Sequence, residues 1–150
     1  MINKYYIRNN TLIDCIENLN NWEQVFIYYL NKCNNFIIYY PGNINEIIPF
    51  KHNYEEFPMI VGKKEFLELD NTFVSKYYGM KDSIKIRGVL NHMSRNLFLE
   101  FMDNSFEGYS SYLWQFELKY KNKTLLKISD FSDCFLFINK TIFQDLKNLI

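Results

Sequence analysis

The sequence contains no alanine, and among its 150 residues it has only 5 glycines, 3 prolines and 3 cysteines. Asn, Ile, Lys, Tyr and Phe are abundant instead. Their codons are AT-rich, so coding bias explains much of the aromatic content of 19%. The 14 Phe and 12 Tyr residues argue against intrinsic disorder, because disordered chains lack aromatic residues. A chain of this length is expected to form one domain over residues 1–150.

Excess charge of either sign is also missing, since 17 basic residues balance 17 acidic ones. A general nucleic-acid binder needs a strong positive field, so this balance disfavours nucleic acid as a partner. The two halves nevertheless differ. Residues 1–75 hold 6 basic and 9 acidic residues, a net −3, and residues 76–150 hold 11 and 8, a net +3.

Long apolar runs and targeting patterns are absent as well. No run of about 18 apolar residues is present, so we expect no transmembrane helix and no membrane partner. The first residues lack an apolar core followed by a small-residue cleavage site, which is the pattern of a signal peptide. We therefore expect a cytoplasmic protein.

The residue patterns that usually reveal an enzyme are not found. Cys15, Cys33 and Cys134 lie far apart without a CxxC pair, which predicts buried reduced thiols rather than disulfides or a zinc site. His52 and His92 belong to no HxH or HExxH motif. Phosphate-binding glycine loops and a GxSxG elbow are also missing. We predict no catalytic residue, no metal site and no cofactor.

The clearest structural pattern is the stretch Tyr112–Tyr120, in which every even position is apolar or aromatic. Successive strand side chains point to opposite faces, so this alternation predicts a β-strand with one heavy apolar face formed by Tyr112, Trp114, Phe116, Leu118 and Tyr120. The short polar loop after Tyr120 predicts a hairpin with a partner strand at 125–128.

The remaining periodicities predict an α+β fold with N-terminal helices, an antiparallel meander of about five strands in the C-terminal half, and a closing C-terminal helix. Apolar spacings of three and four predict helices at 11–20, 22–33, 63–78 and 141–150. Alternating or continuous apolar runs predict strands at 2–8 (an edge strand), 36–40, 84–88, 97–102, 125–128 and 134–138. Residues 43–62 read as an irregular connection.

One acidic group stands out as a candidate site, formed by Glu55, Glu56, Glu65, Glu68 and Asp70. On the predicted 63–78 helix, Glu65 and Glu68 are three residues apart and would share a face. Three interpretations are open: a solvated helix face balanced by nearby lysines, a carboxylate pair for hydrolysis or a hard cation, or a docking surface for a basic partner.

Three functions follow from these patterns. The first is a protein-binding module that neutralises or inhibits a macromolecular partner, in the manner of immunity proteins that neutralise toxins. Its partner would be a protein, such as a basic toxin or nuclease, bound through the acidic group. The second is an enzyme with a site assembled from distant residues, such as His92 with Cys134. The third is a nucleic-acid binder that uses the Lys119–Lys127 hairpin with Tyr112 and Tyr120. We expect the first.

Overall fold

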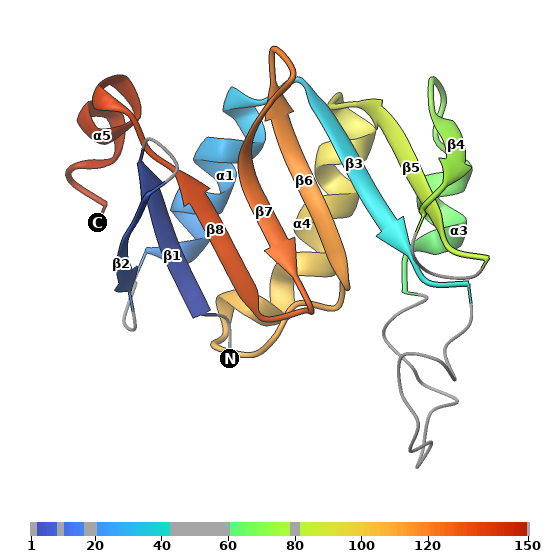
Figure 1. Cartoon of the computed structure of the whole chain (residues 1–150), viewed down its shortest axis with the longest axis horizontal. Coiled ribbons are helices and arrows are strands. Elements are labelled where there is room, and N and C mark those ends of the chain that lie inside the picture. The colour runs from blue at the N-terminus through green and yellow to red at the C-terminus, as the bar shows by residue number, and fades with distance from the viewer. Residues whose placement is uncertain (1–2, 9–10, 17–20, 43–60, 79–81, 150) are drawn as a thin grey trace.

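The computed structural model describes residues 3–8, 11–16, 21–42, 61–78 and 82–149, with residues 3–8 and 11–16 described by their backbone. Eight strands form one sheet in the order β2-β1-β8-β7-β6-β3-β5-β4 (Figure 1). The strands are β1 (Asn3–Arg8), β2 (Thr11–Ile16), β3 (Asn35–Tyr40), β4 (Phe73–Lys76), β5 (Ile84–Val89), β6 (Gln115–Tyr120), β7 (Lys123–Ser129) and β8 (Asp133–Phe137). The helices are α1 (Trp22–Lys32), α3 (Lys63–Leu67), α4 (His92–Phe106) and α5 (Lys140–Leu146).

The sheet confirms the predicted α+β class but differs from the expected meander. Six neighbouring strands, β8 to β4 in the sheet order, are antiparallel to one another, whereas about five were expected. The N-terminal strand β1 then adds in parallel to β8. β3, from the N-terminal third of the chain, lies inside the sheet between β5 and β6.

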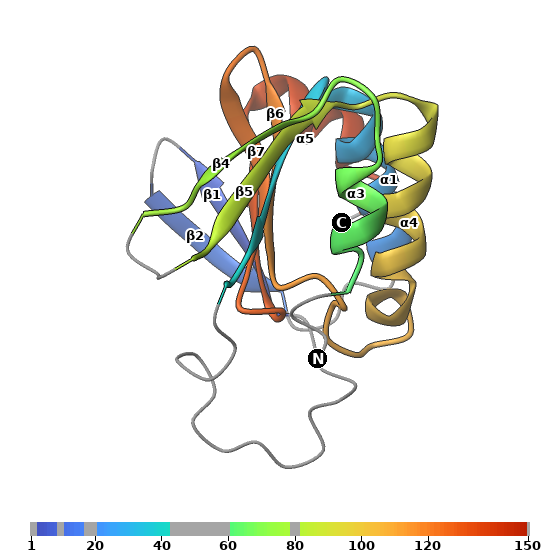
Figure 2. The same cartoon turned by 90° about the vertical axis from the view of Figure 1, so that its right-hand side faces the viewer.

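The helices α1, α3 and α4 all lie on one face of the sheet (Figure 2), which we call the inner face. The core fills the space between the two layers and is rich in aromatic rings. Phe98 of α4 lies between Phe116 and Phe36 of the sheet, with ring centroids 5.0 and 5.3 Å away. Phe26 of α1 packs edge-on against Phe116 at 6.3 Å. The opposite face, here called the outer face, carries no described helix.

Polar contacts fix the helices to one another at their ends. The Arg95 guanidinium of α4 donates hydrogen bonds to the carbonyls of Leu30 and Cys33 at 3.1 and 3.2 Å, where α1 ends and its last carbonyls lack helical partners. The Tyr28 hydroxyl of α1 donates to Asp145 of α5 at 2.6 Å. Side-chain hydrogen bonds therefore link α4 to the C-terminal end of α1, and α1 to α5.

Two predictions for the N-terminal segment were wrong. Residues 11–16 form strand β2, not a helix, and they pair with β1 in a register that sets Arg8 opposite Thr11. Only two residues of the sequence separate these paired ends. The strand predicted at 2–8 exists, but it lies inside the sheet between β2 and β8 rather than at an edge.

Two further predictions were wrong: one extended a helix across the strand β4, and the other took part of a helix for a strand. The helix predicted at 63–78 ends at Leu67, because Asn71 takes a positive φ of 61° and the chain turns into β4. The strand predicted at 97–102 belongs to helix α4, whose buried residues Ser94, Phe98, Met102 and Ser105 recur at helical spacing. The capping box formed by Asn91 and Ser94 begins this helix.

The strand predicted at Tyr112–Tyr120 is present as β6 but is shorter than predicted. Phe116 and Leu118 of β6 are fully buried in the core. Trp114 is buried just before the strand begins, beside the ring of Tyr77, whose centroid is 6.4 Å away. Tyr112 is exposed in the preceding loop. The predicted hairpin with β7, the strands β3, β5 and β8, and the helices α1 and α5 lie within a few residues of their predicted positions.

Candidate interaction surfaces

The first candidate surface lies where the sheet ends at β4. One side of β4 pairs with β5, the other side pairs with no described strand, and all four β4 residues are exposed. Val74 is 52% exposed, and Leu67 of the adjacent α3 is 39% exposed. Large exposed apolar side chains beside unpaired strand backbone are typical of sites where another chain binds.

Three residues of the predicted acidic group lie at this same edge. Glu65 and Glu68 are exposed on α3 and at its C-cap, and Asp70 is exposed in the turn before β4. Glu55 and Glu56 lie outside the described residues. We call Glu65, Leu67, Glu68, Asp70 and Val74 the α3–β4 edge. The sequence pointed to its carboxylates, while Leu67 and Val74 both fell within the helix predicted at 63–78.

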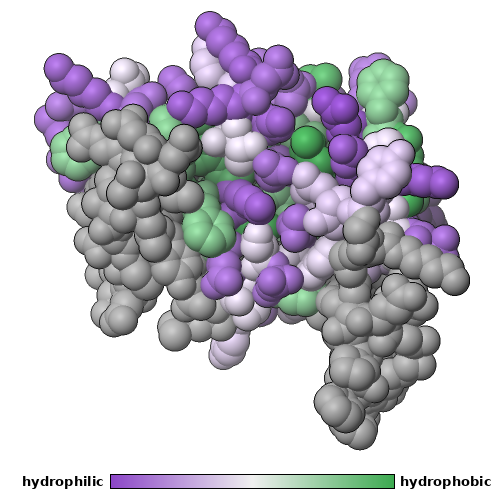
Figure 3. Space-filling model, in the orientation of Figure 1, coloured by the Kyte–Doolittle hydropathy of each residue, from purple (hydrophilic) through white to green (hydrophobic). Residues whose placement is uncertain are grey.

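The second candidate surface is the outer face of the sheet, on which the register arranges side chains in rows. One row runs through Phe73, Arg87, Ile37, Glu117, Lys127 and Phe135, each directly opposite the next. The next row contains Val89, Asn35, Lys119 and Thr124. This face is predominantly hydrophilic where its residues are described (Figure 3). Figure 1 shows the same orientation, with the strands in front of α1 and α4.

Glu117 is the central carboxylate of this face, and two neutral side chains hold it. The Tyr39 hydroxyl donates to Oε2 at 2.5 Å, and the Thr124 hydroxyl donates to Oε1 at 2.7 Å. Burial alone would raise the pKa of Glu117, but these hydrogen bonds and the charges of Lys127 and Lys119 outweigh burial and lower it. The same interaction acts with burial to raise the pKa of Tyr39 well above its ordinary value.

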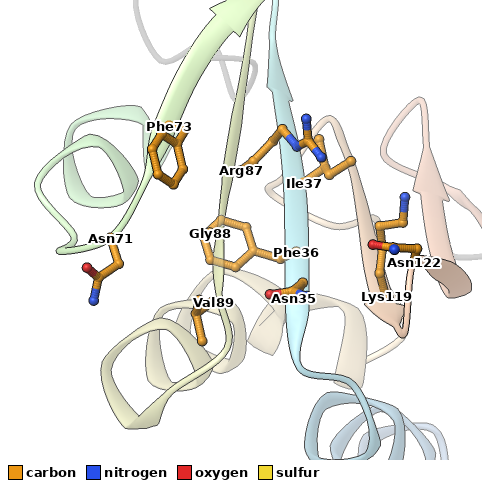
Figure 4. A pocket seen from close by; sticks show the side chains of 10 residues that line it. All are labelled: Asn35, Phe36, Ile37, Asn71, Phe73, Arg87, Gly88, Val89, Lys119 and Asn122. Carbon is orange, nitrogen blue, oxygen red and sulfur yellow. The ribbon is translucent and has the colours of Figure 1, made fainter.

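A pocket of about 250 Å³ opens on this face, between β4 and the hairpin formed by β6 and β7 (Figure 4). Arg87 and Lys119 supply its charges, three asparagines supply amides, and Phe73 and Val89 supply apolar walls. The asparagines are Asn35, Asn71 and Asn122. The Arg87 guanidinium leans over β3 towards Ile37 (Figure 4). The sequence did not predict this pocket, because its residues come from separate parts of the chain that meet only when β3 pairs with both β5 and β6.

The hairpin considered as a nucleic-acid binder does not bring its two tyrosines together. Tyr120 carries Lys32 and Lys121 over its ring, with each ammonium nitrogen 5.5 and 5.2 Å from the centroid. Tyr112 lies in the loop before β6, away from the hairpin tip. Lys119 and Lys127 do lie on the outer face, which links this hairpin to the pocket.

The residues considered for an enzyme site are not brought together. His92 is exposed at the start of α4, where its ring contacts Asn96 at 3.2 Å. Cys134 is fully buried in the core, and neither Cys33 nor Cys134 forms a disulfide bond. Within the described ranges no cluster of three or more His, Cys, Asp or Glu side chains could hold a metal ion. His52 lies outside the described residues.

Two further findings concern membrane-spanning helices and similarity to known proteins. None of the helices that the structure describes has the length and apolar character needed to cross a membrane. In comparisons with known proteins, no family model, curated protein or solved structure matched this chain.

Proposed function

We propose that this protein is a cytoplasmic protein-binding module that neutralises or inhibits a macromolecular partner, and that it docks through the α3–β4 edge. The observation that carries the proposal is the meeting of an exposed apolar strand edge with three exposed carboxylates. An extended segment of a partner can add to such an edge through backbone hydrogen bonds, while adjacent side chains determine which segment fits.

Three carboxylates at this edge, which outnumber the exposed Lys64 of α3 and Lys76 of β4, favour a basic partner. Glu65, Glu68 and Asp70 all lie within the six residues 65–70. A second copy of this chain would bring an identical acidic group to the interface, and like charges placed close together oppose binding. A partner with Lys or Arg residues beside its docking segment would instead be steered towards the edge and held there. Basic toxins and nucleases have this character.

The experiment pairs the chain with candidate partners in cells. The product of each neighbouring gene is expressed with and without this chain, and both growth and co-purification are measured. We expect one toxic product to be neutralised and co-purified. The double charge reversal Glu65→Lys and Glu68→Lys should weaken its binding by at least about tenfold, equal to about 1.4 kcal/mol.

A matched control separates local charge from total charge. Asp103 and Glu107 are exposed at the far end of α4, and their double reversal to lysine changes the net charge by the same amount. This variant should retain full binding. Equal binding by the Glu65/Glu68 variant and the wild-type chain would remove the α3–β4 edge from the interface. Failure of every neighbouring product to bind would contradict the proposed function.

A further inference from the structure

Around Glu117, the outer face carries more cations than carboxylates. The register places Lys85, Arg87, Lys119 and Lys127 on this face around a central carboxylate, Glu117. Both oxygens of that carboxylate already accept hydrogen bonds from Tyr39 and Thr124. Within the described part of the chain, the side chains of Arg87 and Lys119 form no ion pair or hydrogen bond. An anion bound between them would relieve their mutual repulsion.

The geometry allows one ligand to meet both cations. Arg87 and Lys119 lie on strands that flank β3, and they are offset by two residues along it. Strand spacing and rise per residue then place their Cα atoms about 12 Å apart, within reach of two long side chains that bind one phosphate. Their side chains line the same pocket, as Figure 4 shows.

The other walls of the pocket favour a ligand with a flat ring. Phe73 is 74% exposed, and its ring has one side open to a stacking partner. Base–aromatic stacking is the usual means by which a sheet surface holds a nucleotide without reading its sequence. Asn35, Asn71 and Asn122 offer both donors and acceptors for a sugar or a base edge. An acidic peptide would satisfy the cations but would leave this ring uncovered.

We propose that the pocket between Arg87 and Lys119 binds a nucleotide unit, with its phosphate between the two cations and its base against Phe73. The volume of about 250 Å³ lies below the range of about 300–1,000 Å³ usual for small-molecule sites, which suits a single nucleotide rather than a larger cofactor. This inference does not depend on the proposed docking function, because the phosphate would be held by Arg87 of β5 and Lys119 of β6, whereas docking uses the unpaired backbone of β4 and the carboxylates beside it.

The nucleotide can be free or part of a single strand. The tip of the β6–β7 hairpin distinguishes these two cases, because a second pocket adjoins it. Asn122 also lines a second pocket of about 560 Å³, which contains Lys123, Lys127 and Phe135. The two pockets therefore adjoin the same tip and could take successive units of a strand. A free nucleotide would use the first pocket alone.

Calorimetric titration at low salt tests the proposal with four probes: uridine monophosphate, inorganic phosphate, 5′-phosphorylated hexauridine and poly-glutamate. We expect uridine monophosphate to bind more tightly than inorganic phosphate, and poly-glutamate to bind more weakly than either nucleotide probe. Binding should weaken as salt is raised. Hexauridine that binds much more tightly than the monophosphate identifies a nucleic-acid strand as the source, and equal affinity identifies the free nucleotide.

Three substitutions locate the binding. Arg87→Gln and Lys119→Gln should each weaken nucleotide binding by about tenfold and lower its salt dependence. Phe73→Ala should weaken the binding of uridine monophosphate but leave the binding of inorganic phosphate unchanged. Lys140→Gln with Lys147→Gln, both exposed in the α5 region, is the control for non-specific attraction. Absence of nucleotide binding at low salt, tighter binding of poly-glutamate, or an equal loss in the control variant would overturn the proposal.

Discussion

Tyr39 and Glu117, on the neighbouring strands β3 and β6, are joined by a hydrogen bond of 2.5 Å from the phenol to the carboxylate. Thr124 on β7 donates to the other carboxylate oxygen. Three strands are thereby connected on the outer face through one half-buried acid. The hydrogen bonds from Tyr39 and Thr124, together with the charges of Lys127 and Lys119, stabilise the ionised form of Glu117.

This relationship predicts how stability depends on pH. The folded pKa of Glu117 lies below its ordinary value, so its stabilising contribution is complete above the unfolded pKa of about 4.3 and is lost as pH falls through the folded pKa. Glu117→Gln should therefore flatten the fall in stability below about pH 4.3. Urea unfolding at a series of pH values measures this. Identical pH dependence of the variant and wild-type proteins would show that the hydrogen bonds to the ionised carboxylate do not contribute to stability.

The close approach of β5 to β3 predicts a steric effect at Gly88. A Cβ atom added there would lie 2.6 Å from Cζ of Phe36, which is itself packed against Phe66 and Phe98. Gly88→Ala should cost about 1–3 kcal/mol of stability, because the ring cannot move without disturbing the core. Chemical denaturation gives the value. The double variant with Phe36→Leu should lose less than the sum of the two single variants, and simple additivity would refute the predicted clash.

The capping box of α4 predicts a loss at Asn91. Its side chain accepts a hydrogen bond from the Ser94 N–H at 3.0 Å, while the Ser94 hydroxyl accepts one from the Asn91 N–H at 2.8 Å. Asn91→Ala should cost about 0.5–2 kcal/mol, the usual loss when an N-cap is removed. Thermal or urea unfolding measures the change. Asn96→Ala, on the exposed surface of the same helix, is the control and should leave stability nearly unchanged.

Sequence periodicity identified elements well where local spacing was clear and failed where tertiary contacts decided. The stripe in α1 and the alternation in β6 and β7 correspond to buried faces, as expected. In Leu97–Met102, nearly every residue is apolar, so period two and helical spacing both fit, and only the Asn91–Ser94 cap identifies a helix. Thr11–Ile16 has the same ambiguity, which its pairing with β1 settles as a strand.

The candidate surfaces show the same division. The carboxylates Glu65, Glu68 and Asp70 could be grouped from sequence because they are close along the chain. The pocket between Arg87 and Lys119 could not, because β3 comes from a distant part of the chain and inserts between β5 and β6. The alternation in 84–88 places Lys85 and Arg87 on the polar side of a strand. A single sequence does not show which strand pairs with it.

Burial of Cys33 and Cys134 predicts low reactivity of these two thiols. Burial raises the pKa of Cys33 to about 12, against the weaker opposing effect of the Lys32 and Arg95 charges, and the residue is 1% exposed. Cys33 and the fully buried Cys134 should resist iodoacetamide in the folded protein and react after unfolding in urea. Peptide mapping by mass spectrometry follows each site. Labelling of either thiol in the folded protein as fast as in urea would contradict the buried placement.

Hydrogen exchange on the complex with the neutralised partner tests the docking account most directly. The amides of Phe73–Lys76 lie on an exposed edge strand and should gain protection when the partner binds, together with those of the adjacent α3. The amides of α5, at the other end of the sheet, should be unchanged. Protection confined to other elements, with β4 exchanging as fast as in the free protein, would contradict the claim that the α3–β4 edge is the docking surface.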